Sequence, residues 1–469
     1  MKRVATNMSL LRKIDLTTIK AEFVENNLKK TLTVTDLTML SIGAIIGVGA
    51  FVLTGIAAAK FAGPAIVLSY LLAGIVCILT GLLYLELAAI IPTSGSSYSY
   101  AYASMGEIVA WIVFWFMMME YTTGSSLIAI GWGGYINGIL ESGYGIFIPK
   151  DFLTTPWEGG IINLPPVLIT LVLTMLLIKG TKESSIINII LVVIKTLALI
   201  LFVVFAFPNL NFEYWENFMP FGAKGLVTGT ATVILAYVGF DALASATEES
   251  INPKRDLPIA IIVSLLICIL IYMSVSASLT LIVPYYTLDN AEPMAYALRA
   301  IGNKYGAIII AVGAVAGITT SLIVQIFGQS RVLFAIARDG LIPNKLSVVH
   351  KRYHTPYIST VFVGIIIALV AGLVPLEFIS KLASIGILVS FLTVAIGVLI
   401  FRIKIPTFQR SFKCPLVWIV APLSFIICMY LLSDLLVTTW DVCLVWLVLG
   451  IIFYFAYGYK NSKLNNLTE

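Results

Sequence analysis

Glycine interrupts two apolar segments of the chain where continuous helix would otherwise be expected. The first segment, GAIIGVGAF, carries Gly43, Gly47 and Gly49, and the second, ILAYVGFDALASA, carries Gly239. Each glycine costs a helix interior about 1 kcal/mol relative to alanine, so this spacing favours interrupted helices. For the first segment taken alone, close helix packing through Gly43 and Gly47 is an equal alternative.

An interrupted helix at membrane depth has the chemistry to bind a zwitterion through its backbone. Unwinding frees N–H and C=O groups, which is tolerated there only if they line a cavity or meet a ligand. The N–H groups that begin a half-helix favour an anion, and the carbonyls that end the preceding half favour a cation. Matching interruptions in two halves of a chain are typical of transporters built from inverted repeats. Free α-amino acids carry both charges and fit such a site.

Lys195 is the ionisable residue that lies deepest within an apolar stretch, NIILVVIKTLALILFVVFAF. It stands about 18 Å from either end at 1.5 Å rise per residue, so its side chain cannot easily reach the interface. A charge at this depth costs roughly 2.5–3.5 kcal/mol on insertion scales and is functional by default. Lys195 is therefore a candidate proton carrier, and a permanently charged structural tether is the alternative.

Four other polar side chains stand within apolar segments. Glu120 and Gln325 are each predicted either to face a substrate cavity or to bond a neighbouring helix. Asp241, beside the second interruption, is expected to cap exposed N–H groups. Glu86 is expected to fix helix packing near the cytoplasmic end.

The composition excludes a water-soluble globule. Of 469 residues, 59% are apolar and 11% charged, against about 45–50% and about 25% in soluble proteins. The 21 Tyr, 25 Phe and 8 Trp exclude disorder. The chain therefore indicates a polytopic membrane protein, in which the net charge of +5 reports orientation and does not suggest nucleic acid.

The distribution of basic residues orients the predicted helices. With a cytoplasmic N-terminus, 22 Lys and Arg lie in cytoplasmic segments and five in outer loops. This asymmetry predicts that both termini are cytoplasmic. The polar segment 92–106 is expected to be an interfacial loop along the cytoplasmic face. The predicted all-α fold has twelve spans, at 35–59, 65–91, 107–138, 164–180, 184–207, 226–248, 258–283, 306–336, 357–374, 378–401, 415–433 and 440–458.

Six motifs together resemble the amino acid–polyamine–organocation superfamily, and in particular its bacterial permeases of the cationic amino acid transporter type. The resemblance runs from Asp36 to about Lys463. The motifs are DLTMLSIGAIIGVGAFVLTG (36–55), AGPA (62–65), YLELAAIIPTSGSSYSYAY (84–102), AYVGFDALASATEESINPKRDLP (236–258), GQSRVLFAIARDGLIP (328–343) and TPY (355–357).

The resemblance implies a core of two inverted five-helix repeats, 34–207 and 226–402. Two peripheral helices would follow in 414–459, between a cytoplasmic N-terminal segment, 1–33, and a cytoplasmic tail, 460–469. It implies proton-coupled uptake of L-amino acids by alternating access across the plasma membrane. Lys195 would stand where sodium-coupled relatives hold sodium, and would tie the first helix to the eighth.

The resemblance also implies which backbone groups contact the substrate. The carbonyls of Ile45, Leu235 and Val238 would bind the ammonium. The N–H groups of Val48 and Gly49, beside Gly47, would bind the carboxylate. Phe240, after Gly239, would lie against the substrate as an aromatic gate.

Several other functions are less consistent with the sequence. An exchanger without proton coupling is the alternative within transport, and Thr319 and Thr320 leave sodium coupling as a minority option. A sensor would be expected to carry a signalling domain. No enzyme activity, cofactor or metal is expected, because His350 and His354 have no partnered Cys cluster and the five cysteines are scattered. The lipid bilayer is the expected surrounding, and any single-span partner stays unknown.

Overall fold

The computed structural model describes residues 32–91, 96–179, 185–240, 250–353, 355–406, 408, 410 and 412–463. For residues 185–189, 253 and 254 only the backbone is described. The described part of the chain is helical, and its β pairing consists of one isolated bridge between Leu32 and Ser250. Asp241 lies outside the described residues, as do residues 1–31 and 464–469.

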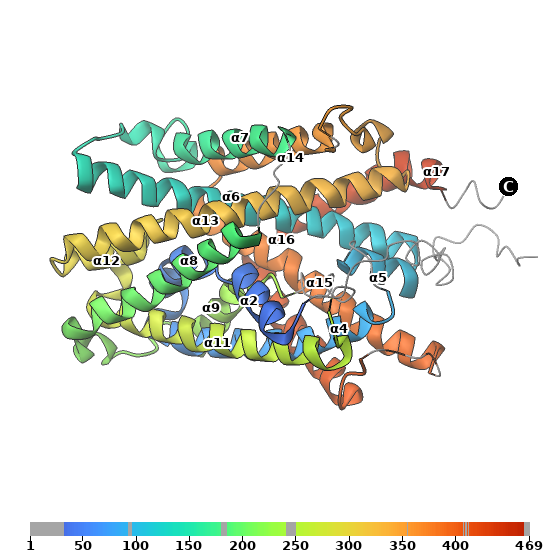
Figure 1. The fold of residues 1–469 in the computed structure, drawn as a ribbon, viewed down its shortest axis with the longest axis horizontal. Helices are drawn as coiled ribbons and strands as arrows, with labels where there is room; N and C mark the ends of the chain where they lie inside the picture. Colours follow the sequence, from blue (N-terminus) through green and yellow to red (C-terminus); the bar gives the residue numbers. More distant parts are fainter. Residues whose placement is uncertain are drawn as a thin grey trace, which may run out of the picture.

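The helices form an elongated bundle in which most run along the long axis (Figure 1). The helix α12 lies at one end, and α5 and α17 lie at the other. We call these the α12 end and the α5 end. The main helices are α2 (Val34–Ile45), α4 (Ile66–Ala88), α5 (Ser96–Ser104), α6 (Glu107–Tyr144), α7 (Leu164–Lys179), α8 (Ser185–Ala206), α9 (Gly222–Val233), α11 (Pro253–Ile282), α12 (Pro293–Ala300), α13 (Lys304–Arg338), α14 (Tyr357–Leu373), α15 (Leu376–Lys404), α16 (Val417–Phe453) and α17 (Tyr459–Asn461).

Local sequence explains where several of these helices begin and end. A capping box joins Thr33 and Asp36 at the start of α2, which satisfies N–H groups that have no partner inside the helix. The chain reverses before α4 at Gly63, whose φ of 62° suits glycine, and Pro64 follows at the start of the next turn. Gly145, in the left-handed conformation, ends α6.

Apolar side chains cover much of the outside of the bundle. Trp418 and Ile419 on α16, Val172 on α7 and Leu270 on α11 are all more than half exposed. Six helical runs in the described residues are long and apolar enough to cross a membrane, and three shorter apolar helices accompany them. The helix bounds follow most of the predicted spans, while the count of twelve and the inverted repeat stay predictions.

The last two predicted spans, 415–433 and 440–458, appear as one helical run, α16. A straight helix of 37 residues would be about 55 Å long. Cys414, just before α16, donates its N–H to Glu86, and Tyr454, just after it, donates to Glu107. Both ends of α16 therefore bond to residues that flank α5 in the chain.

Two buried carboxylates hold the α5 end together. Glu86 is fully buried and pairs with Arg402 through two hydrogen bonds of 2.6 and 2.8 Å. Glu107, also fully buried, accepts hydrogen bonds from the hydroxyls of Tyr102, Tyr454 and Ser462. These bonds join α4 to α15 and the start of α6 to the last described residues, so the helix ends are fixed here.

Candidate functional site

The first predicted interruption is present. The helix α2 ends at Ile45, and Ile46 takes an extended conformation with φ −70° and ψ 109°. The chain then continues as a π-helix, η1 (Gly49–Leu53). The first N–H groups of a helix have no acceptor within it, so those of Val48 and Gly49 are available to an anion.

The second interruption lies against the first. After α9 the chain forms a 3-10 turn, η8 (Ile234–Tyr237), and Val238 is extended with ψ 140°. Gly239 has φ 123°, and a Cβ there would come within 2.6 Å of the Ala44 carbonyl. The close contact and the positive φ both require glycine at this position.

The glycines of the first segment also allow α2 and η1 to approach their neighbours closely. A Cβ on Gly43 would lie 2.5 Å from Val192 on α8, and a Cβ on Gly47 would lie 3.0 Å from Ser321 on α13. A side chain on Gly49 would overlap the backbone of Ala236. Both sequence interpretations, interruption and close packing, therefore apply to the same glycines.

A cavity of about 430 Å³ lies along the two interruptions. Its wall is formed by the interrupted segments together with α5, α6, α8 and α13. Ten of the residues predicted for the site line it: Ile45, Gly47, Val48, Gly49, Glu120, Lys195, Leu235, Val238, Gly239 and Gln325.

Lys195 bridges three helices beside this cavity. Its side chain is 2% exposed, and its Nζ donates a 2.5 Å hydrogen bond to the carbonyl of Gly43 at the end of α2. Its stem lies against Gly317 on α13, where a Cβ would come within 2.6 Å of the lysine Cβ. The ammonium thus donates to a carbonyl in the last turn of α2. Carbonyls in the last turn of a helix have no N–H donor within their own helix.

Tyrosine hydroxyls satisfy other carbonyls of the interrupted segments. The Tyr272 hydroxyl lies 3.1 Å from the Ile45 carbonyl and 2.9 Å from that of Ala236. The Tyr70 hydroxyl donates to the Gly49 carbonyl over 2.8 Å. Sequence reasoning missed these residues, because an aromatic in an apolar run is more often a packing residue and its partners lie far along the chain.

Glu120 and Gln325 reach the cavity from α6 and α13. The Cβ of Glu120 lies against Gly386 on α15, so the acid is also a close-packing residue. Gln329, one turn after Gln325, donates to Thr122 over 2.7 Å, whereas Gln325 faces the cavity. Gln325 thus lines the cavity, and its contact with a substrate side chain stays a prediction.

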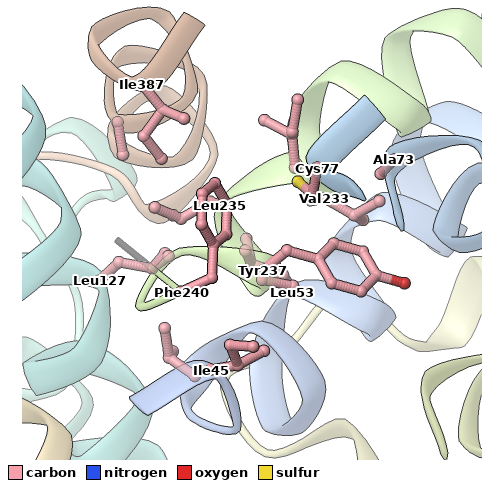
Figure 2. Packing of buried hydrophobic residues seen from close by; sticks show 14 of the residues in the cluster. Ile45, Leu53, Ala73, Cys77, Leu127, Val233, Leu235, Tyr237, Phe240 and Ile387 are labelled. Atoms are coloured by element: carbon pink, nitrogen blue, oxygen red, sulfur yellow. The ribbon is translucent and has the colours of Figure 1, made fainter. Parts of the chain in front are cut away.

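Phe240 does not line this cavity. Its ring is buried against Tyr84 and Phe391 and borders a separate space of about 20 Å³. Figure 2 shows Phe240 on the side of Ile387, while Tyr237 points the opposite way, towards Ala73. This small space shares Glu120 and Val238 with the main cavity, and the contact of Phe240 with substrate stays a prediction.

The segment expected to be an interfacial loop, 92–106, contains the helix α5. Most of its side chains are buried, and Ser96, Tyr98 and Tyr100 line the cavity at the α5 end. Tyr98 donates to Asp339 after α13. The sequence signal for this buried helix was the mixture of aromatic and small residues in SSYSYAYAS, which allows tight packing without an apolar run.

Among the described residues, the lining of the cavity continues towards the α5 end of the bundle. It reaches Arg331 and Ala335, close to the end of α13 beside α5. On the α12 side, Trp132 donates to Thr319 over 2.9 Å and Tyr135 donates to the Phe51 carbonyl over 2.8 Å. These contacts join α6 to α13 and to η1.

Comparison with known proteins agrees with this architecture. A family model described as amino acid permease matches residues 32–458. The chain belongs to the amino acid permease family. It is thus a multi-pass membrane protein of the amino acid–polyamine–organocation superfamily and not an enzyme. In the described residues, no group of three or more His, Cys, Asp or Glu is placed to hold a metal ion.

Individual relatives cover most of the chain. The branched-chain amino acid permease BcaP of Bacillus subtilis is 41% identical over 95% of this chain and 97% of its own length. The methylthioribose transporter of the same organism is 39% identical over 97% and 99%. Cationic amino acid transporter 3 of Arabidopsis thaliana, a mitochondrial protein, is 36% identical over 81% of this chain and 63% of its own length.

Proposed function

We propose that this permease takes up L-amino acids by alternating access, that uptake is coupled to protons through Lys195, and that the protein lies in the plasma membrane with both termini cytoplasmic. The observation that carries the proposal is the cavity between the interrupted helices, with Lys195 beside it. Free N–H groups at Val48 and Gly49 suit a carboxylate, and the carbonyls of the preceding turn suit an ammonium.

Lys195 supports proton coupling in preference to sodium. Its ammonium bonds the Gly43 carbonyl and so stands beside the first interruption. The hydroxyl of Thr319 accepts from Trp132, and that of Thr320 donates to the Gly317 carbonyl. Loss of the proton from Lys195 would weaken its bond to the Gly43 carbonyl, because a neutral amine is a weaker donor than an ammonium, and α2 could then move relative to α8 and α13.

Uptake of labelled amino acids into proteoliposomes tests both parts of the proposal. We expect uptake to rise when the proton gradient points inward, and Lys195→Ala to abolish the response to that gradient. Lys224→Ala, at an exposed position in the first turn of α9, is the control and should behave like the unmodified protein.

The outcomes separate the alternatives. If Lys195→Ala keeps full gradient-driven uptake, Lys195 is not the coupling residue. Counterflow that ignores the gradient would indicate an exchanger. Methylthioribose, as in the name of one relative, carries no ammonium or carboxylate. If it is transported and amino acids neither enter nor compete, the amino acid assignment is wrong.

A further inference from the structure

A second cavity, of about 540 Å³, lies between α7, α13 and α14 at the α5 end. Three basic residues from separate segments line it: Lys179 at the end of α7, Arg331 on α13 and Arg352 in the loop before α14. Four hydroxyl residues also line it: Ser330, Tyr353, Thr355 and Thr360. The donors thus converge from three directions on one space.

The basic residues of this cavity are not neutralised within the described part of the chain. None of Lys179, Arg331 and Arg352 forms one of the ion pairs found there, and no Asp or Glu lines the cavity. Like charges that converge without a counterion repel one another, and an anion between them removes that cost. Arginine is well suited to phosphate oxygens because its planar group donates two parallel hydrogen bonds.

Hydrogen bonds hold the described residues of the loop that supplies Arg352. The Nδ1 atom of His350 accepts the backbone N–H groups of Arg352 and Tyr353 at 3.2 and 3.3 Å. Thr355 donates to the Ile178 carbonyl at the end of α7 over 2.8 Å. A ligand therefore does not have to order this loop, which lowers the entropic cost of binding.

Exposed apolar side chains lie beside the cavity, in the direction of the middle of the helices. Met175 on α7 and Phe362 on the neighbouring helix α14 are 63% and 47% exposed, and neither lines the transport cavity. Exposed apolar side chains on neighbouring helices are the surface that acyl chains cover in a bilayer. The cavity thus places a cluster of basic groups beside an apolar surface. This arrangement matches a phospholipid, whose charged phosphate adjoins its apolar acyl chains.

We propose that this cavity binds the phosphate of an anionic phospholipid, with Lys179, Arg331 and Arg352 as the cationic ligands. Basic cavities between transmembrane helices bind anionic headgroups in this way. The apolar surface beside the cavity favours a lipid over free phosphate, which has no acyl chains to place there. The site differs from the transport cavity, although Arg331 and Phe327 line both.

Native mass spectrometry of the purified full chain in detergent tests the site. The probes are phosphatidylglycerol, phosphatidylcholine and inorganic phosphate, each titrated separately. We expect phosphatidylglycerol to bind most tightly. The double variant Lys179→Gln/Arg352→Gln should bind it about 25-fold more weakly, at about fivefold per basic side chain. Neither residue lines the transport cavity.

Two control variants make the result specific. Lys351→Gln removes a charge from the same loop outside the cavity and should leave binding unchanged. Lys179→Arg/Arg352→Lys keeps both charges and should retain binding, which separates charge from folding. Equal binding of phosphatidylglycerol and phosphatidylcholine, or unchanged binding by the double glutamine variant, would overturn the proposal. Inorganic phosphate that binds as tightly as phosphatidylglycerol would show that the ligand is free phosphate and overturn the lipid assignment.

Discussion

Single hydroxyl groups stabilise the interrupted helices. A carbonyl released by unwinding must find a donor when water is absent, and Tyr272 meets two such carbonyls, at Ile45 and Ala236. The sequence identified the glycines because their effect on a helix is local. It could not identify Tyr272, because its partner Ile45 is 227 residues away.

Tyr272→Phe tests this role at the residue scale. The ring and its packing stay, while two buried carbonyls lose their donor. Leaving buried polar groups unsatisfied costs about 1–3 kcal/mol, so we expect a lower free energy of unfolding and slower uptake. Thermal unfolding in detergent and initial uptake rates measure the two effects.

Tyr305→Phe is the matched control, because Tyr305 is 84% exposed near the α12 end. It should change neither measurement. If Tyr272→Phe has the same unfolding temperature as the unmodified protein, other groups satisfy these carbonyls.

At the scale of elements, α8 and α13 pack closely enough to enclose a lysine between them and α2. Gly313 and Gly317 on α13 face Ala198 and Lys195 on α8. The length of the apolar stretches and the placement of charged residues predicted the bounds of both helices to within a few residues. These signals lie within the sequence of each helix itself. The helix α5 was missed because its burial depends on α6 and α15, which its own sequence does not report.

Gly317→Ala tests the enclosure of Lys195. A Cβ at position 317 would come within 2.6 Å of the lysine Cβ, so either the lysine or α13 must shift. Overpacking of this kind costs about 1–3 kcal/mol, and the bond from Lys195 to Gly43 should weaken. We expect uptake to lose most of its response to the proton gradient in proteoliposomes.

Gly143→Ala provides the comparison, since a Cβ there meets nothing within 4 Å. It should leave both stability and uptake unchanged. A Gly317→Ala protein with the full response to the gradient would show that the position of Lys195 tolerates displacement.

At the scale of the whole molecule, access to the transport cavity is one-sided. The cavity reaches Ala335 near the α5 end, while Ala295 on α12 is fully buried at the opposite end. The positive-inside pattern predicts that the α5 end is cytoplasmic, so we propose that this structure is an inward-facing conformation. The sequence could not indicate this, since one sequence must allow both conformations.

Thiol labelling of intact cells checks this conformation. All five native cysteines are buried, so a membrane-impermeant reagent should give little background. Ala335→Cys should react only after the membrane is permeabilised. Tyr305→Cys, exposed near the α12 end, should react in intact cells and serves as the positive control. Rapid labelling of Ala335→Cys from outside would contradict the inward-facing assignment.

The buried carboxylate of Glu107 has a practical consequence for studying the moving protein. Ser462 donates to this carboxylate, and the N–H of Lys463 donates to the Asp339 carbonyl just after α13. The last described residues are therefore anchored between α6 and α13, beside the mouth of the cavity. A spin label attached at Lys463, paired with one at Tyr430 on α16, which is 60% exposed, would report how the end of α13 moves relative to α16 without altering a residue that lines the cavity.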